Sequence, residues 1–190
     1  MAENYPVIVG VGQITNRSER LEESLEPLDL MARAASAAEE DSGRTGLLAK
    51  ADSVQVVNIM SWPYTDAPGM LAERVGASQG QKLYSAVGGE TPQRLVNEVA
   101  EAIVEGRTRL ALIAGAEAMN SRRLARKLGV QLNWSLRGNP EHVSGDRRMG
   151  FSEVEARHGA TMPIRMYPLF ENSIRAHLAL SIEEHRERLG

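Results

Sequence analysis

The stretch that decides the fold runs from residue 91 to residue 114 and reads TPQRLVNEVAEAIVEGRTRLALIA. Thr91 can cap a helix, Pro92 suits its first turn, and Gly106 is a typical helix end. Apolar residues recur between them at helical spacing, so one face of the helix can pack on a core. Residues 110–114 then form an unbroken apolar run, which is typical of a parallel strand buried on both faces. The stretch therefore predicts a helix followed by an interior strand of a sheet.

Short apolar runs alternate with helical patterns upstream of this stretch. Three runs have the length and composition of strands, at Val7–Val11, Val54–Ile59 and Lys82–Val87. Helical patterns separate them, at residues 28–43 and 67–76. Alternating strands and helices joined by right-handed crossovers are typical of an α/β fold. We therefore expect a four-stranded, mainly parallel sheet in the order βαβαβαβ, with helices on both faces.

The composition changes after residue 120. Arginine, glycine and proline become frequent up to about residue 168, and the periodicity is weak. Helices are expected again at residues 169–178 and 182–189. We therefore interpret residues 1–120 as an α/β domain and residues 121–190 as a loop-rich region without a large sheet of its own.

Charge is distributed unevenly along the chain. The net charge is −3 at pH 7, yet residues 121–150 carry seven basic side chains and only two acidic ones. This asymmetry indicates a local anionic partner rather than general binding to nucleic acid or to a membrane. The basic residues between 122 and 127 are compatible with two interpretations, a solvated helix face or a phosphate-binding surface.

The absence of cysteine excludes disulfides, thiolate metal sites and a cysteine nucleophile. The four histidines are widely spaced and show no metal-ligand pattern, so no metal site is expected. Residues 1–6 lack the basic and apolar regions of a signal peptide, and no apolar run approaches the ~20 residues that span a bilayer. We expect a cytoplasmic protein.

Two glycine-containing turns follow predicted strands. Residues 10–15, GVGQIT, half-resemble a dinucleotide fingerprint, but the polar stretch after them delays the next helix, which favours a tight turn. Residues 87–92, VGGETP, lie where a strand passes into a helix. Two glycines permit close approach of a ligand, and a helix N-terminus can hold an oxyanion or activate a nucleophile. A plain turn is the equally weighted alternative.

Several stretches, taken in order, resemble the first half of a thiolase-superfamily protein. The opening PVIVGVG at residues 6–12 resembles the family's first strand, and residues 90–113 correspond to its nucleophile helix and following strand. GAEAMNS at 115–121 is similar to a Gly-rich signature that leads into the cap domain, and LSIEEH at 180–185 resembles a cap-domain turn and helix start. The resemblance is closest to the sterol-carrier-type and acetyl-CoA acetyltransferase-like branch. It implies that residues 1–120 form a thiolase N-terminal domain that lacks its last strand. Residues 121–190 would then form part of a cap domain.

The resemblance implies no catalytic residue in this chain. Family members place a nucleophilic cysteine 17 positions before the glycine that ends the helix, and counting back from Gly106 gives Gly89. A glycine cannot be acylated, so Claisen condensation through an acyl-cysteine is excluded. The family's other catalytic groups belong to a second, C-terminal repeat that this sequence does not reach. We therefore expect the chain alone to be inactive, and to be a fragment or to receive the other half from another chain.

The resemblance also implies a coenzyme A thioester as ligand or substrate, with no covalently bound cofactor. The family's cap domain holds the CoA phosphates, so four basic residues become the predicted contacts: Arg122, Arg123, Arg126 and Lys127. Three functions remain as hypotheses: a CoA-ester-binding protein of acyltransferase ancestry in lipid metabolism, a carbon–carbon lyase acting on CoA thioesters, or a non-catalytic acyl-CoA-binding or assembly module. Family members pair through the edge strand, here Lys82–Val87, so a homodimer or a C-terminal thiolase half is the expected partner.

Overall fold

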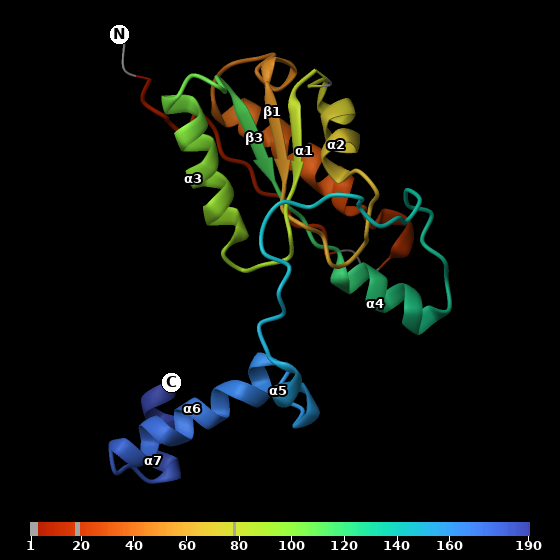
Figure 1. Ribbon diagram of the computed structural model, residues 1–190. Coiled ribbons are helices and arrows are strands. Elements are labelled where there is room, and N and C mark those ends of the chain that lie inside the picture. The colour runs from red at the N-terminus through yellow and green to blue at the C-terminus, as the bar shows by residue number, and fades with distance from the viewer. Residues whose placement is uncertain (1–3, 18–19, 78) are drawn as a thin grey trace. The chain divides into compact units, whose positions relative to one another are not determined.

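The computed structural model describes residues 4–17, 20–77 and 79–190. The chain forms two compact units, one ending at Asp146 and the other comprising Arg147–Gly190 (Figure 1). Each unit has its own helices, and we describe the two separately. No helix among the described residues is both long and apolar enough to cross a bilayer.

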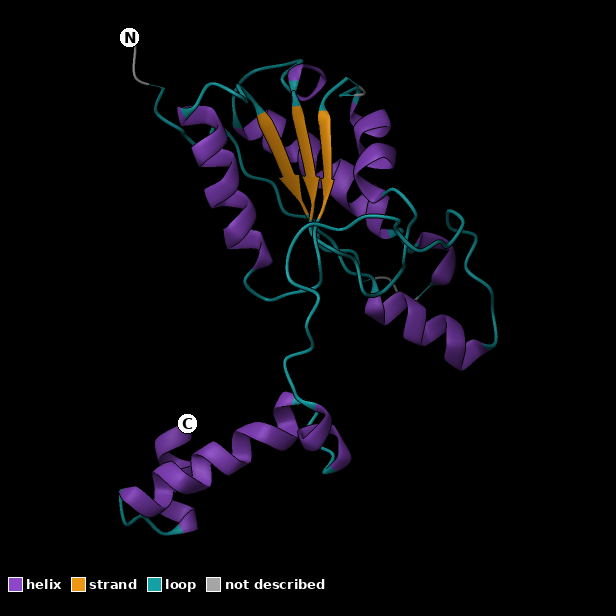
Figure 2. Ribbon diagram, in the orientation of Figure 1, coloured by secondary structure: helices purple, strands orange, loops and turns teal. Residues whose placement is uncertain are grey.

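The first unit contains a sheet of three parallel strands, which Figure 2 shows as three arrows pointing the same way. The strands are β1 (Ser53–Val56), β2 (Gln81–Tyr84) and β3 (Ala111–Ala114), in the order β2-β1-β3. Val54 in the central strand lies opposite Lys82 on one side and Leu112 on the other. The predicted α/β class with a mainly parallel sheet is therefore confirmed.

Three helices pack on this sheet, and their ends follow local sequence. α1 (Pro27–Asp41) and α3 (Thr91–Val104) each carry proline in the first turn, where the missing N–H costs nothing. α2 (Ala67–Val75) begins where the Asp66 carboxylate accepts a hydrogen bond from the backbone N–H of Gly69 and ends at Gly76, which is left-handed. α1 and α2 pack together, whereas α3 contacts β3 (Figure 1). Two short 3-10 helices, η1 (Leu21–Glu23) and η2 (Leu48–Lys50), flank α1 in sequence.

The core lies between β1 and the helices α1 and α2. All four residues of β1 are buried, and the fully buried apolar side chains around it include Leu28, Val54, Val56 and Leu71. Each of these side chains contributes roughly 1.5–3 kcal/mol by leaving water. This packing fixes the loops that follow the strands.

The predicted first strand, Val7–Val11, is not a strand in the structure. Residues 4–17 have no regular secondary structure, and Ile8 is 80 % exposed. The segment lies against α1 instead: the Val11 N–H donates to the Asp41 carboxylate at 2.9 Å, and Gly10 and Gly12 approach the helix backbone too closely to allow a Cβ. These two glycines let the chain follow α1 and not the sheet, so the sheet has three strands and not four.

The loss of that strand changes the position of β3. The sequence predicted residues 110–114 as an interior strand buried on both faces, whereas β3 is an outer strand and all four of its residues are half-buried. The prediction is wrong on this point. The strand that is central and fully buried is β1.

The opposite edge of the sheet is extended by a loop residue, Ser144. Its N–H donates to the Tyr84 carbonyl at 2.8 Å, and its carbonyl accepts from the Ala86 N–H at 2.7 Å. The Arg94 guanidinium also donates to the Ser144 carbonyl, at 3.0 Å. The loop thus forms hydrogen bonds with main-chain groups at the end of β2, to which an additional strand would otherwise bond.

α4 (Met119–Leu128) and the loop after it complete the first unit. The loop is bonded to the sheet unit through Ser135 as well as Ser144, and the compact unit extends to residue 146. The domain division at residue 120 stays a prediction. Whether residues 121–190 act as a cap domain stays a prediction.

The second unit is entirely helical, with α5 (Glu153–Arg157), α6 (Pro163–His177) and α7 (Ile182–Leu189). Ser152 and Ser181 form capping boxes at the starts of α5 and α7. The range predicted for the last helix is confirmed. The helix predicted at 169–178 starts earlier, because Pro163 opens it and Pro168 is tolerated inside it.

Candidate functional site

The loops that leave the carboxyl ends of the three strands are tied to one another. Asn58, after β1, donates from its backbone N–H to the Ser85 hydroxyl at 3.0 Å and from its amide to the Ser85 carbonyl at 2.9 Å. The Glu117 carboxylate, after β3, accepts from the backbone N–H groups of Met60 and Ser61 at 2.7 and 2.8 Å. Ligands of parallel α/β sheets bind outside this edge. We therefore treat these loops as the candidate site.

The buried hydroxyl groups in these loops have structural roles. Ser85 and Thr91 are completely or almost completely buried. The Ser85 hydroxyl accepts from Asn58 and donates to the Ala86 carbonyl at 2.9 Å, and the Thr91 hydroxyl donates to the same carbonyl at 3.4 Å. Both groups are thus used within the turn, and neither is available as a nucleophile.

The turn before α3 contains Gly89, the residue for which the sequence resemblance predicts the position of the family's cysteine. Gly89 is exposed, has an ordinary backbone φ, and would place an added Cβ in open space with no atom within 4 Å. The neighbouring Gly88 differs, since a Cβ there would lie 2.6 Å from a carboxylate oxygen of Glu90. The Glu90 side chain therefore folds back over the turn, close to the N-terminus of α3, where a negative charge is favoured.

Tyr84 and Tyr64 lie below these loops, and both phenols stay protonated. Burial is the main reason that the pKa of each tyrosine is raised, and the nearby Glu26 carboxylate adds to the effect on the pKa of Tyr64. The Tyr84 hydroxyl accepts a hydrogen bond from the Ile59 N–H at 3.2 Å. Neither tyrosine can act as a base near neutral pH.

The Glu26 carboxylate joins three segments beside the site. It accepts from the Tyr64 hydroxyl at 3.1 Å, from the Arg74 guanidinium at 2.9 Å, and from both the N–H and the hydroxyl of Ser135 at 3.0 and 2.8 Å. Glu26 is only 5 % exposed, so its charge needs all of these partners. The carboxylate thereby links the start of α1, the end of α2 and the loop after α4.

The four predicted phosphate contacts lie on α4. Its buried residues are Ser121 and Ala125, and the basic side chains project from the exposed part of the helix: Arg122, Arg123, Arg126 and Lys127. Arg122 donates to the Ser61 carbonyl at 3.4 Å, which places this guanidinium beside the loop after β1. Arg123 donates to Asn120 of its own helix at 2.9 Å. The structure places one of the four, Arg122, at the strand ends. The role of the four residues in binding CoA stays a prediction.

An aromatic cluster formed by the loops after β1 and α4 was missed by the sequence interpretation. Trp62 and Trp134 meet edge to face with ring centroids 5.0 Å apart, and the Arg137 guanidinium lies 4.5 Å from the Trp62 ring centroid. The Trp62 indole N–H donates to the Ser135 carbonyl at 2.9 Å. Trp62 and Trp134 are 72 positions apart in the sequence, so no local pattern indicated that they pair.

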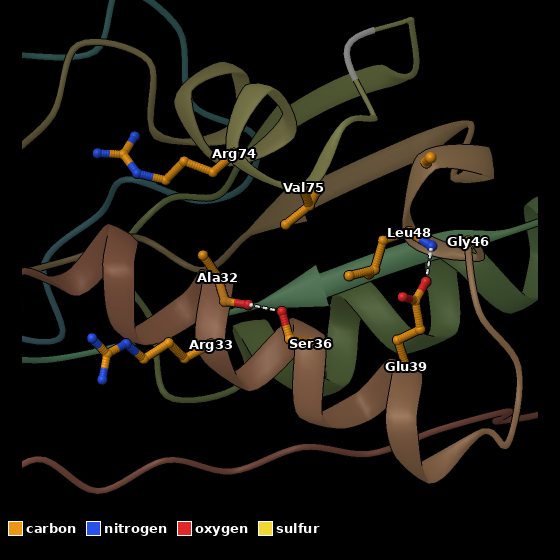
Figure 3. A pocket seen from close by; sticks show the side chains of 9 residues that line it. Ala32, Arg33, Ser36, Glu39, Gly46, Leu48, Arg74 and Val75 are labelled. Carbon is orange, nitrogen blue, oxygen red and sulfur yellow. Dashed lines mark hydrogen bonds between the residues drawn. The ribbon is translucent and has the colours of Figure 1, made fainter.

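A cavity of about 320 Å³ lies elsewhere, between α1, α2 and the segment before β1 (Figure 3). Three of its polar side chains already have partners within the protein. Glu39 accepts from the Leu48 N–H at 2.8 Å, the Ser36 hydroxyl donates to the Ala32 carbonyl, and Arg74 pairs with Glu26. We assign it no function.

The sheet, its helices and the turn before α3 define a thiolase-like α/β protein. The chain is similar to a solved structure, a monomeric SCP2-thiolase like protein type 1 from Mycobacterium smegmatis, with a TM-score of 0.69 and 27 % identity. The match covers 96 % of this chain and 32 % of that protein, so the chain spans about a third of its length. The resemblance to the thiolase superfamily seen in the sequence is thus confirmed. Neither a protein-family model nor a curated protein matches the chain.

Proposed function

We propose that this chain is the N-terminal part of a thiolase-like protein that binds CoA thioesters without forming an acyl-cysteine. One observation carries the proposal: the fold is thiolase-like over nearly the whole chain, and the chain contains no cysteine. The sequence resemblance assigns the nucleophile position to Gly89. The fold supports the ligand class, and Gly89 argues against covalent chemistry. Thiolase-type acyl transfer is the ancestry of the site and not its present reaction.

The chemistry around the turn supports binding without acyl transfer. A covalent acyl intermediate needs a nucleophile with a base in reach. The hydroxyls of Ser85 and Thr91 are buried and used within the turn, and Tyr84 stays protonated. Incubation with acetyl-CoA is therefore expected to leave the intact mass unchanged, and an acetyl adduct within residues 88–91 would contradict the proposal.

The basic face of α4 supports recognition of the CoA phosphates. Phosphate groups accept paired hydrogen bonds from guanidinium groups, and arginine suits this geometry better than lysine does. A single exposed pair contributes only about 0–1 kcal/mol, so the four residues must act together. Removing them is expected to weaken CoA binding about ten- to hundredfold.

The test is isothermal titration calorimetry with CoA at two salt concentrations. It compares the wild type with a variant in which Arg122, Arg123, Arg126 and Lys127 are changed to alanine, which preserves the helix. A matched control removes the same charge from exposed positions of the second unit: Arg157, Arg165, Arg186 and Arg188. Weaker binding in the first variant alone supports the proposal. Equal affinity in all three proteins makes the α4 residues a solvated face, and no binding to the wild type contradicts the proposed function.

The second unit favours one further candidate, an assembly module. No apolar side chain of residues 147–190 is buried, and α6 exposes Ile164 at 80 % and Phe170 at 59 %. Apolar surface of this kind marks a contact with another polypeptide. A C-terminal thiolase half or a second copy of this chain would suit it. The carbon–carbon lyase stays an untested hypothesis.

A further inference from the structure

Both tryptophans of the chain gather at the carboxyl end of the sheet. Trp62 belongs to the loop after β1 and Trp134 to the loop after α4, and their rings meet at an interplanar angle of 71°. The hydrogen bond from the Trp62 indole to the Ser135 carbonyl fixes the orientation of one ring. This arrangement brings two flat side chains from distant parts of the sequence to one place beside the candidate site.

One guanidinium group lies over a ring, and a second lies beside the loop that carries this ring. Arg137 lies over the Trp62 ring at 4.5 Å, and Arg122 donates to the carbonyl of Ser61, the residue that precedes Trp62. Both arginines are exposed, and within the described part of the chain neither forms an ion pair with a carboxylate. Their positive charge is therefore available to an anion that approaches the aromatic pair.

The two rings differ in how they are covered. Trp62 packs against the hydrophobic core and carries Arg137 on its ring, whereas Trp134 touches Trp62 edge to face. Both are half-buried, so each keeps some surface toward solvent. A partly exposed indole that contacts an arginine-covered ring suits a ligand that combines a flat ring with phosphates.

We infer that Trp134 and the Arg137–Trp62 stack form a platform for the purine ring of a nucleotide, and that Arg122 contacts a phosphate of the same ligand. This assignment rests on the proposed function, because CoA carries an adenine nucleotide at one end. It deepens that function by locating recognition at the nucleotide end of the ligand.

The test uses adenosine 3′,5′-diphosphate and CoA as separate probes, with intrinsic fluorescence as the readout. Trp62 and Trp134 are the chain's two tryptophans, so the signal reports on the platform itself. Both probes are expected to quench the fluorescence. The Trp134→Leu variant should bind both about tenfold more weakly or worse, because base stacking typically changes affinity by roughly five- to hundredfold.

Three further variants separate stacking from loop structure. Trp134→Phe keeps a flat ring and should recover much of the affinity, and Arg137→Lys keeps the charge but loses the planar stack and should not. Tyr167→Leu removes an exposed aromatic residue of the second unit and should bind like the wild type. Circular dichroism checks that each variant is folded. Loss of binding in Trp134→Phe equal to that in Trp134→Leu would overturn the stacking role.

The two probes also separate this inference from the proposed function. Calorimetric binding of CoA with unchanged fluorescence, and with wild-type affinity in Trp134→Leu, would overturn the platform and leave CoA binding intact. Binding and quenching by adenosine 3′,5′-diphosphate without binding of CoA would support the platform and contradict the proposed function. Failure of both probes to bind would overturn both.

Discussion

Gly89, the residue that the resemblance assigns to the nucleophile position, lies where the fold would accept a side chain. Its position has an ordinary φ and open space where a side chain would point, so the glycine is not required by backbone geometry. The turn would accept a larger residue without rearranging. The backbone of this turn therefore does not dictate glycine at this position.

We predict that Gly89→Ala changes the free energy of unfolding by less than about 1 kcal/mol. Gly80→Ala is the matched control, because its Cβ would lie 2.9 Å from the Ala51 carbonyl oxygen and meet the backbone of Asp52. That variant should be destabilised by about 1–3 kcal/mol, since backbone atoms cannot move aside cheaply. Urea unfolding measures both. Equal destabilisation by the two substitutions would show that the space beside Gly89 is not open.

The buried tyrosines predict a loss of stability at high pH. Their pKa values are raised in the folded chain, so the unfolded chain loses these protons first, near its ordinary pKa of about 10. The stabilising contribution is complete below that pH and is lost as the pH rises above it. Tyr84→Phe should reduce the decline between about pH 9 and 11, measured by urea unfolding at each pH. Tyr167→Phe, at an exposed position, should leave the decline unchanged, and an identical decline in Tyr84→Phe would contradict the assignment.

At the scale of the element, local sequence predicts helices better than strand partners. Pro92 and Gly106 predicted the start and the end of α3, and the range predicted for α2 agrees closely with the structure. Residues 7–11 carry a strand-like apolar run, but a strand exists only where a neighbour accepts its hydrogen bonds. Gly10 and Gly12 let this segment lie on α1, and that contact is not visible in any local pattern.

Like the helices, the candidate site was predictable only where it depends on local sequence. Gly89 and the basic residues of α4 could be proposed from the sequence because each candidate lies in one continuous stretch. The tryptophan pair was missed because Trp62 and Trp134 belong to loops far apart in sequence, and only the folded sheet brings these loops together. Contacts of this kind depend on the sheet order, which the sequence predicted with one strand too many.

The outer strand β2 gives a prediction about association. Ser144 pairs with the main chain of Tyr84 and Ala86, so another strand must displace this loop to pair there. Ser144→Pro removes the N–H that donates to Tyr84 and should expose the edge, which promotes concentration-dependent dimers. Light scattering coupled to size-exclusion chromatography measures the mass. Ser144→Ala keeps both main-chain bonds and should behave like the wild type, and an unchanged mass for Ser144→Pro at every concentration would contradict the prediction.

At the scale of the whole molecule, the two units differ in how much apolar surface they bury. The first unit has a continuous core around β1, whereas the second unit buries none of its apolar side chains. A helical unit of this kind gains little from its own packing. Its stability and its role both depend on a surface that covers it.

We predict that the second unit is the main site of hydrophobic dye binding. Changing Tyr167, Phe170 and Ile174 on α6 to serine should reduce the fluorescence of bound anilinonaphthalene sulfonate by about half or more, because these residues supply exposed apolar surface. Val87, Val96 and Val104 are exposed in the first unit, and their change to serine is the control. A larger decrease in the control would place the dye on the first unit instead.

The four hydrogen bonds of Glu26 determine how the first unit opens. A loop that follows a surface helix normally exchanges its amide hydrogens within the time of local fluctuations. The Ser135 amide is instead held by a carboxylate that also binds Tyr64 and Arg74, so it cannot be released without uncovering a charge inside the protein. Slow exchange at Ser135, at a rate matching the amides of β1, would make this loop residue part of the last structure to unfold.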